Sequence, residues 1–99
     1  MVIVLGEFRL PPEHRARALP LMARAVAATL AEDGCLRYCY AEDVCEPGLF
    51  RVSERWRDRQ SLAAHLATPH MAQWRAEREK LGFGDLQIAV HEAQPGEPL

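Results

Sequence analysis

Apolar residues recur with two different periods along this chain, and the order of those periods constrains the fold more than any other feature. Over 49–57, Phe50, Val52 and Trp56 alternate with charged or small side chains, as in a strand with one covered face. Over 12–32 the spacing is three or four residues instead, as on one face of a helix. That apolar stripe consists of Leu19, Met22, Ala23, Val26 and Leu30.

The same criteria assign the rest of the chain. Pro20 is expected to kink or restart the first helix, because it removes a backbone donor, and Thr68-Pro69 is expected to restart the second. In the second strand, Leu36, Tyr38 and Tyr40 are expected to share a face. Strands are predicted over 2–9, 35–43, 49–57 and 86–90, and helices over 12–32 and 59–81.

The resulting order of strand, helix, strand, strand, helix, strand predicts an α+β fold of the ferredoxin-like class. In that fold, both helices cover one face of an antiparallel sheet. We assign a single domain to 1–94 and a flexible tail to 95–99. The other face of the sheet also carries apolar residues that need shielding from water, namely Ile3, Leu5, Cys39 and Ala89. Pairing two sheets face to face would bury them, so we expect a homodimer; a sheet left half in contact with water is the alternative.

Charge and composition narrow the class of partner. The chain of 99 residues has a net charge of -2, and its twelve basic residues are scattered, so nucleic acid is not expected as a partner. No apolar run approaches the roughly 20 residues that cross a bilayer, and the first residues do not resemble a signal peptide. We therefore expect no membrane contact and a cytoplasmic protein.

Cysteine and histidine spacing gives no metal signature. Cys35, Cys39 and Cys45 form no CxxC pair and are interpreted as reduced thiols, with Cys35 and Cys39 on one face of a strand. His65 and His70 are five residues apart across a helix break, which does not match the i, i+4 pair of a zinc helix. Glycine-rich phosphate loops and dinucleotide fingerprints are also missing from the sequence. Neither a metal nor a cofactor is expected.

Three segments resemble the antibiotic biosynthesis monooxygenase family, and most closely its small quinol-monooxygenase-like branch. They are Asp33-Gly34-Cys35-Leu36-Arg37-Tyr38, Glu54-Arg55-Trp56, and Ser61-Leu62-x-x-His65-Leu66-x-Thr68-Pro69-His70-Met71. The similarity extends from Val2 to about Glu92. It implies a dimeric α+β barrel of two ferredoxin-like chains, each with a pocket between sheet and helices. Many members oxidise phenolic or quinol-like compounds with O2 and without metal, flavin or haem. Others in the wider superfamily degrade haem, or isomerise or bind small molecules.

The resemblance also places individual residues. His65 matches the helix position that faces the pocket, and Glu54 and Trp56 match the strand residues that flank it. Phe8 stands where the haem-degrading and some polyketide-oxidising relatives carry an asparagine. This departure weakens any mechanism that needs an amide to hold O2 or a substrate oxygen, and it makes haem degradation the weaker interpretation.

Glu54 is unusual on the pattern alone, because it lies between Val52 and Trp56 on the apolar side of a strand. A buried carboxylate needs a partner. That partner is either a buried arginine or backbone donor, or His65, whose ring the carboxylate would orient. A lone histidine on an apolar helix face can equally be a hydrogen-bonded structural residue.

These arguments give two hypotheses of function. In the first, the protein is a cofactor-independent monooxygenase that oxidises a phenolic or hydroquinone-type aromatic with O2, with His65 as base and Glu54 as its orienting group. In the second, it is a non-catalytic small-molecule-binding or stress-related dimeric barrel. The residues expected to contact an aromatic substrate are Trp56, Trp74, Tyr38, Phe8, Phe50 and His70; a surface position for His70, in the first turn of its helix, is the alternative.

Overall fold

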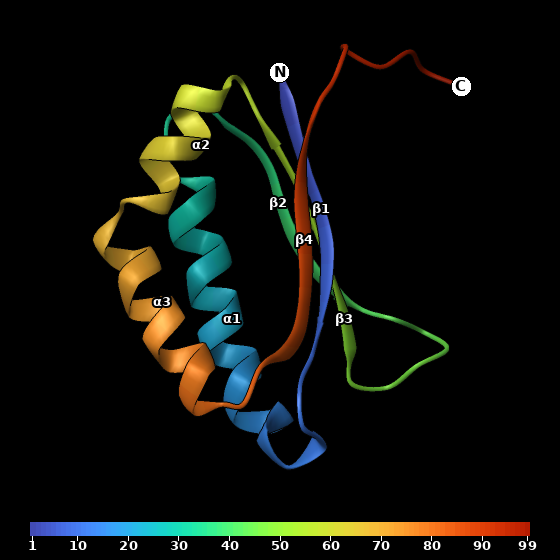
Figure 1. The fold of residues 1–99 in the computed structure, drawn as a ribbon, viewed down its shortest axis with the longest axis vertical. Helices are drawn as coiled ribbons and strands as arrows, with labels where there is room; N and C mark the ends of the chain where they lie inside the picture. The colour runs from blue at the N-terminus through green and yellow to red at the C-terminus, as the bar shows by residue number, and fades with distance from the viewer.

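The computed structural model describes all 99 residues, and its elements follow the predicted order (Figure 1). Thr68 accepts a hydrogen bond from the backbone of Met71 and caps a new helix there, so the second predicted helix is divided into two consecutive helices. A single 3₁₀ turn, η1, precedes the first helix. The elements are β1 (Val2–Arg9), η1 (Pro12–His14), α1 (Arg15–Leu30), β2 (Cys35–Glu42), β3 (Leu49–Trp56), α2 (Arg59–Leu66), α3 (Pro69–Lys80) and β4 (Gly84–Glu92).

The four strands form one antiparallel sheet in the order β2-β3-β1-β4. All three helices lie against the same face of it, on the left in Figure 1. The predicted ferredoxin-like α+β fold is therefore confirmed. Val4 lies opposite Glu54 on one side and Val90 on the other, so these three side chains point toward the helices.

Two clusters of buried apolar residues hold the layers together. The larger cluster surrounds Phe8, Phe50 and Trp74 and lies beneath α1 and α3. A smaller one contains Val2, Val4, Tyr38 and Trp56, at the end of the sheet near α2. No helix is both long and apolar enough to cross a membrane.

The buried stripe of α1 matches the predicted one only in part, at Met22 and at the half-buried Val26. Its buried residues are Ala18, Met22, Ala25 and Thr29, whereas Leu30 is 51% exposed. Small alanine side chains let α1 approach the neighbouring layers closely, so they replace the leucines at the contact. Of the two expectations for Pro20, a kink or a restart, the restart is wrong, because one continuous helix includes this proline.

A β-bulge changes the faces of β2. The pairing with β3 shifts between Cys35 and Arg37, so Leu36 is the extra residue and is 54% exposed. Cys35 packs inward against the smaller cluster, while Cys39 lies opposite Ser53 on the other face. Two predictions are therefore wrong: Leu36 does not share the buried face of Tyr38, and the two cysteines do not share a face.

The strand β4 is the least covered part of the sheet. Its helix-facing residues Ile88 and Val90 are 44% and 38% exposed, because the helices make their main sheet contacts with β2 and β3. The space between the sheet and the helices is consequently open along β4, which is the edge nearest the viewer in Figure 1.

Candidate active site

A cavity of about 270 Å³ lies between the sheet and the helices α2 and α3. That volume suits a ligand of one or two rings, at the small end of ordinary ligand sites. Its lining is largely hydrophobic and includes the exposed β4 residues Ile88 and Val90, so the cavity opens at that edge. The polar groups of the lining belong to Tyr38, Tyr40, Glu54, His65, Arg75 and Arg78.

His65 is placed by the last turn of α2. The helix begins where Asp58 accepts a hydrogen bond from the backbone of Ser61, at 2.7 Å. Two turns later His65 is 1% exposed and lines the cavity. Its ring packs against those of Trp56 and Tyr38, with centroids 4.7 and 5.4 Å away. The imidazole therefore has one fixed position between the two aromatic side chains.

Glu32, in the turn after α1, holds the other side of this ring. Its Oε2 lies 2.7 Å from Nδ1 of His65 and 2.9 Å from Nε2 of His70. One carboxylate oxygen thus joins two histidines from two different helices. Glu32 is not among the residues predicted from the sequence, because its only local signal is an acid just before the Asp33-Gly34 turn.

These contacts determine the chemistry of His65. A carboxylate accepts hydrogen bonds, so Nδ1 of His65 carries the proton and Nε2 keeps its lone pair. Nε2 has no hydrogen-bond partner in the protein. Burial lowers the pKa of His65, while Glu32 acts in the opposite direction. Near neutral pH the ring is therefore uncharged, with a basic nitrogen available to a ligand.

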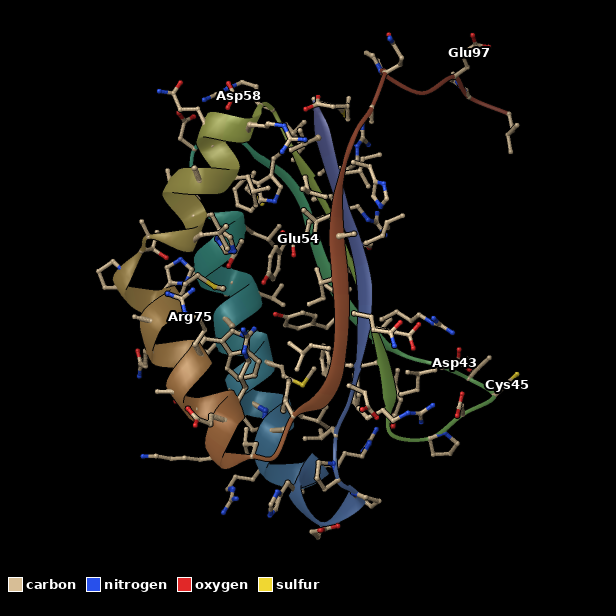
Figure 2. The ribbon with its side chains drawn as sticks, viewed as in Figure 1. Asp43, Cys45, Glu54, Asp58, Arg75 and Glu97 are labelled. Atoms are coloured by element: carbon tan, nitrogen blue, oxygen red, sulfur yellow. The ribbon has the colours of Figure 1, made fainter.

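Glu54 projects into the space between the sheet and the helices (Figure 2). It is 7% exposed, and its Oε1 accepts a hydrogen bond from Nε1 of Trp56 at 2.9 Å. Burial raises its pKa, which shifts the carboxyl toward its protonated form. The predicted Glu54–His65 pair is wrong, because the indole two residues along the same strand face binds the acid. The group that orients His65 is Glu32.

Two tyrosines provide a further polar group in the cavity. Their hydroxyls lie 2.9 Å apart, and Nε1 of Trp74 donates to the hydroxyl of Tyr40 at 3.1 Å. The two hydroxyls have two protons, and only one of these lies between them. The other proton has no acceptor in the protein, so this pair can donate one hydrogen bond to a ligand oxygen.

The structure separates the predicted substrate contacts into two groups. Phe8 and Tyr38 line the cavity, together with the predicted catalytic residues. Four others do not line it: Trp56, Trp74, Phe50 and His70. The wall of this cavity is therefore formed without these four side chains. The first three are 0%, 1% and 3% exposed because they fill the core behind the cavity wall, and His70 is turned toward Glu32. The side chain of His70 is 26% exposed, so it lies partly at the surface.

The cluster of Glu32, His65 and His70 is also the group that could hold a metal ion, with ligand atoms within 4.8 Å of one another. Both nitrogen–oxygen distances are those of hydrogen bonds. Metal-bound imidazoles usually donate from their second nitrogen to an oxygen acceptor. Nδ1 of His70 is buried without a partner and Nε2 of His65 has none. The residues fit a hydrogen-bonded network better than a metal site.

Comparison with known proteins identifies the family. The family model described as antibiotic biosynthesis monooxygenase matches residues 1–77. The chain belongs to this family. It is 33% identical to the probable quinol monooxygenase YgiN of Escherichia coli, over 97% of this chain and 99% of that protein.

A solved structure supports this assignment to the antibiotic biosynthesis monooxygenases. A crystal structure of a Deinococcus radiodurans protein classed in the same family is 34% identical and superposes with a TM-score of 0.93, over 100% of this chain and 98% of that one. The uncharacterized protein sll1783 of Synechocystis is 29% identical over 69 residues, and this match spans 47% of that longer protein.

Proposed function

We propose that this protein is a cofactor-independent monooxygenase that oxidises a phenolic or hydroquinone-type aromatic with O2. The observation that carries the proposal is His65: a neutral imidazole, held by Glu32 through Nδ1, in the wall of a mostly apolar cavity. Support also comes from membership of the monooxygenase family and from the similarity to the Escherichia coli protein, a probable quinol monooxygenase.

His65 begins the reaction as a general base. Nε2 removes the phenolic proton, and Glu32 stabilises the imidazolium that forms. The aromatic anion then gives one electron to O2, and the resulting radical and superoxide combine at a ring carbon that bears hydrogen. Loss of water from the hydroperoxide leaves a carbonyl at that carbon. One oxygen atom enters the product and the other leaves as water, so a dihydroxyarene and O2 give a hydroxyquinone and H2O.

The remaining polar groups support the anionic stages. The free hydroxyl proton of the Tyr38–Tyr40 pair donates to a substrate oxygen as charge develops on it. Glu54, with its raised pKa, is suited to give a proton to the peroxide before water is lost. Phe8 and the other apolar side chains keep bulk water away from the anion and the superoxide.

Oxygen uptake and isotope incorporation test this proposal. Wild-type protein is incubated with a panel of naphthohydroquinones under 18O2, and the uptake and the label in the product are measured. We expect uptake above the autoxidation background and one labelled oxygen in the product. His65→Ala is expected to lose about a hundredfold or more of the enzymatic rate, as for removal of a general base.

Gln73→Ala, on the exposed surface of α3, is the matched control and should keep the wild-type rate. Circular dichroism confirms that each variant is folded. Equal rates for wild type and His65→Ala would remove His65 from the mechanism. Aromatic binding without any oxygen uptake would instead favour the small-molecule-binding function.

We also propose that the protein is a homodimer paired through the open face of the sheet. On that face, Leu5 is 50% exposed and lies opposite Ala89 and Ser53, which are also on the uncovered side. Burial of this apolar centre against a second copy would remove it from water. Sedimentation of wild type and Leu5→Glu tests this: we expect a dimer and a monomer, respectively, and a monomeric wild type would contradict the proposal.

A further inference from the structure

The arginines of this chain differ in whether a carboxylate neutralises them. Six of the eleven form ion pairs with acidic side chains. Of the other five, Arg17, Arg37 and Arg55 are exposed to water, whereas Arg75 and Arg78 are half-buried. The two half-buried arginines both line the cavity.

Both residues project from one side of α3, since positions three apart are neighbours on a helix surface. Figure 2 shows Arg75 on this helix and Glu54 between the helices and the sheet. Nη2 of Arg75 donates to the carbonyl of Leu66 at 3.3 Å, which places Arg75 beside the end of α2. Arg78 lies toward the tyrosine pair, where its charge lowers the pKa of both hydroxyls, although burial has the larger and opposite effect.

The acid that lines the cavity does not serve as their counter-ion. Glu54 lines the same space, yet no oxygen of it lies within 4.0 Å of either guanidinium, and its hydrogen bond comes from Trp56. A guanidinium held partly out of water binds a carboxylate strongly, through parallel N–H donors that match the two oxygens. The cavity thus combines an apolar body with unneutralised positive charge on one wall.

We propose that Arg78, assisted by Arg75, forms an anion subsite. The ligand of this cavity is then an aromatic acid that carries a ring hydroxyl as well as a carboxylate. The carboxylate lies against the guanidiniums of α3, and the ring extends between Phe8 and Met71 toward His65. That this ligand is a substrate rests on the proposed function, whereas the anion subsite does not.

The size and polarity of the cavity favour this class over other anions. About 270 Å³ accommodates a one- or two-ring acid, whereas a nucleotide or an acyl-coenzyme A would extend far outside it. The apolar lining stabilises a flat ring, and an inorganic anion would leave that surface empty. A carboxylate on the ring also fixes which hydroxyl reaches Nε2 of His65, so the subsite would determine the position of oxidation.

Anaerobic calorimetry tests the subsite without turnover. The probes are 1-hydroxy-2-naphthoate and 1-naphthol, which share the ring and the hydroxyl but differ in charge. We expect wild type to bind the acid about ten- to a hundredfold more tightly than the naphthol, as for a charge-assisted pair. Salt should weaken binding of the acid and leave that of the naphthol unchanged.

Variants identify the residues responsible. Arg78→Gln should lose at least tenfold in affinity for the acid and none for the naphthol, and Arg75→Gln should lose less. Arg78→Lys, which keeps the charge, should recover part of the affinity and guards against a folding defect in Arg78→Gln. Arg17→Gln removes an exposed, unpaired arginine from α1 and is the matched control, which should bind both probes as wild type does.

Equal affinity of wild type for the two probes would overturn the proposal. So would an equal loss for both probes in Arg78→Gln, or an equal effect of Arg17→Gln. Preference for the acid in a protein that shows no oxygen uptake would contradict the proposed function and leave the subsite standing. Oxygen uptake without a preference for the acid would contradict the subsite and leave the proposed function standing.

Discussion

Replacing Glu32 by glutamine isolates the part of the site that holds the catalytic histidine. The side chain keeps its size and one acceptor oxygen, so the geometry around His65 is largely preserved. Its negative charge is lost at 2.7 Å from Nδ1. The change therefore removes charge stabilisation without opening a cavity.

The magnitude follows from the strength of the hydrogen bond. A bond to a charged partner contributes about 1.5–3 kcal/mol, and a neutral one about 0.5–1.5 kcal/mol. The imidazolium formed during proton transfer thus loses about 1–1.5 kcal/mol of stabilisation in Glu32→Gln. Because about 1.4 kcal/mol corresponds to tenfold in rate, we expect kcat to fall about tenfold.

The pH dependence has a definite sign. Glu32 raises the pKa of His65 against the larger effect of burial, so the variant histidine has a still lower pKa. The acid limb of kcat/KM, where His65 becomes protonated, should therefore move to lower pH. As the pH falls through this limb, the rate deficit of the variant should shrink.

Steady-state oxygen uptake over a pH series measures both effects, with Glu13→Gln, an exposed acid of η1, as the matched control. Nitrogen-15 NMR of the wild type should show His65 protonated at Nδ1, independently of any substrate. A limb that stays in place or moves to higher pH, or a histidine protonated at Nε2, would refute the role assigned to Glu32.

Three further predictions concern stability and are checked by urea denaturation. Phe8→Ala should cost about 3–5 kcal/mol, because it removes a ring stacked between two phenylalanines in the core; a loss below about 1 kcal/mol would show that the cavity collapses. Gly6→Ala should cost about 1–3 kcal/mol, since its Cβ would lie 2.5 Å from the backbone oxygen of Gln87; unchanged stability would mean that β4 moves freely. Glu54→Gln should gain stability relative to wild type as the pH rises above about 4.5, because burial raises the pKa of Glu54 above that ordinary value and its ionisation then destabilises the folded state; a stability difference that does not change with pH would contradict the burial of that carboxyl.

Sequence patterns predicted the elements well where one period dominates. The alternation of β3 and the capping residues Asp58 and Thr68 each depend on local geometry, so the predicted elements agree with the observed ones. Errors arose where two elements meet. The stripe of α1 is set by how closely Ala18 and Ala25 can approach other layers, and the bulge at Leu36 by the register with β3. Neither of these is local.

The candidate site shows the same division. By itself, the chain determined that His65 lies on a buried helix face and that Glu54 lies on a buried strand face, because each follows from one period and its apolar neighbours. Only the tertiary structure decided their partners: Glu32 reaches His65 from 33 residues away, and Arg75 and Arg78 turn toward the space beside β4. Periodicity specifies which face of an element is covered. Which acid meets which base depends on how the layers pack, and that is determined by the shapes of all the buried side chains together.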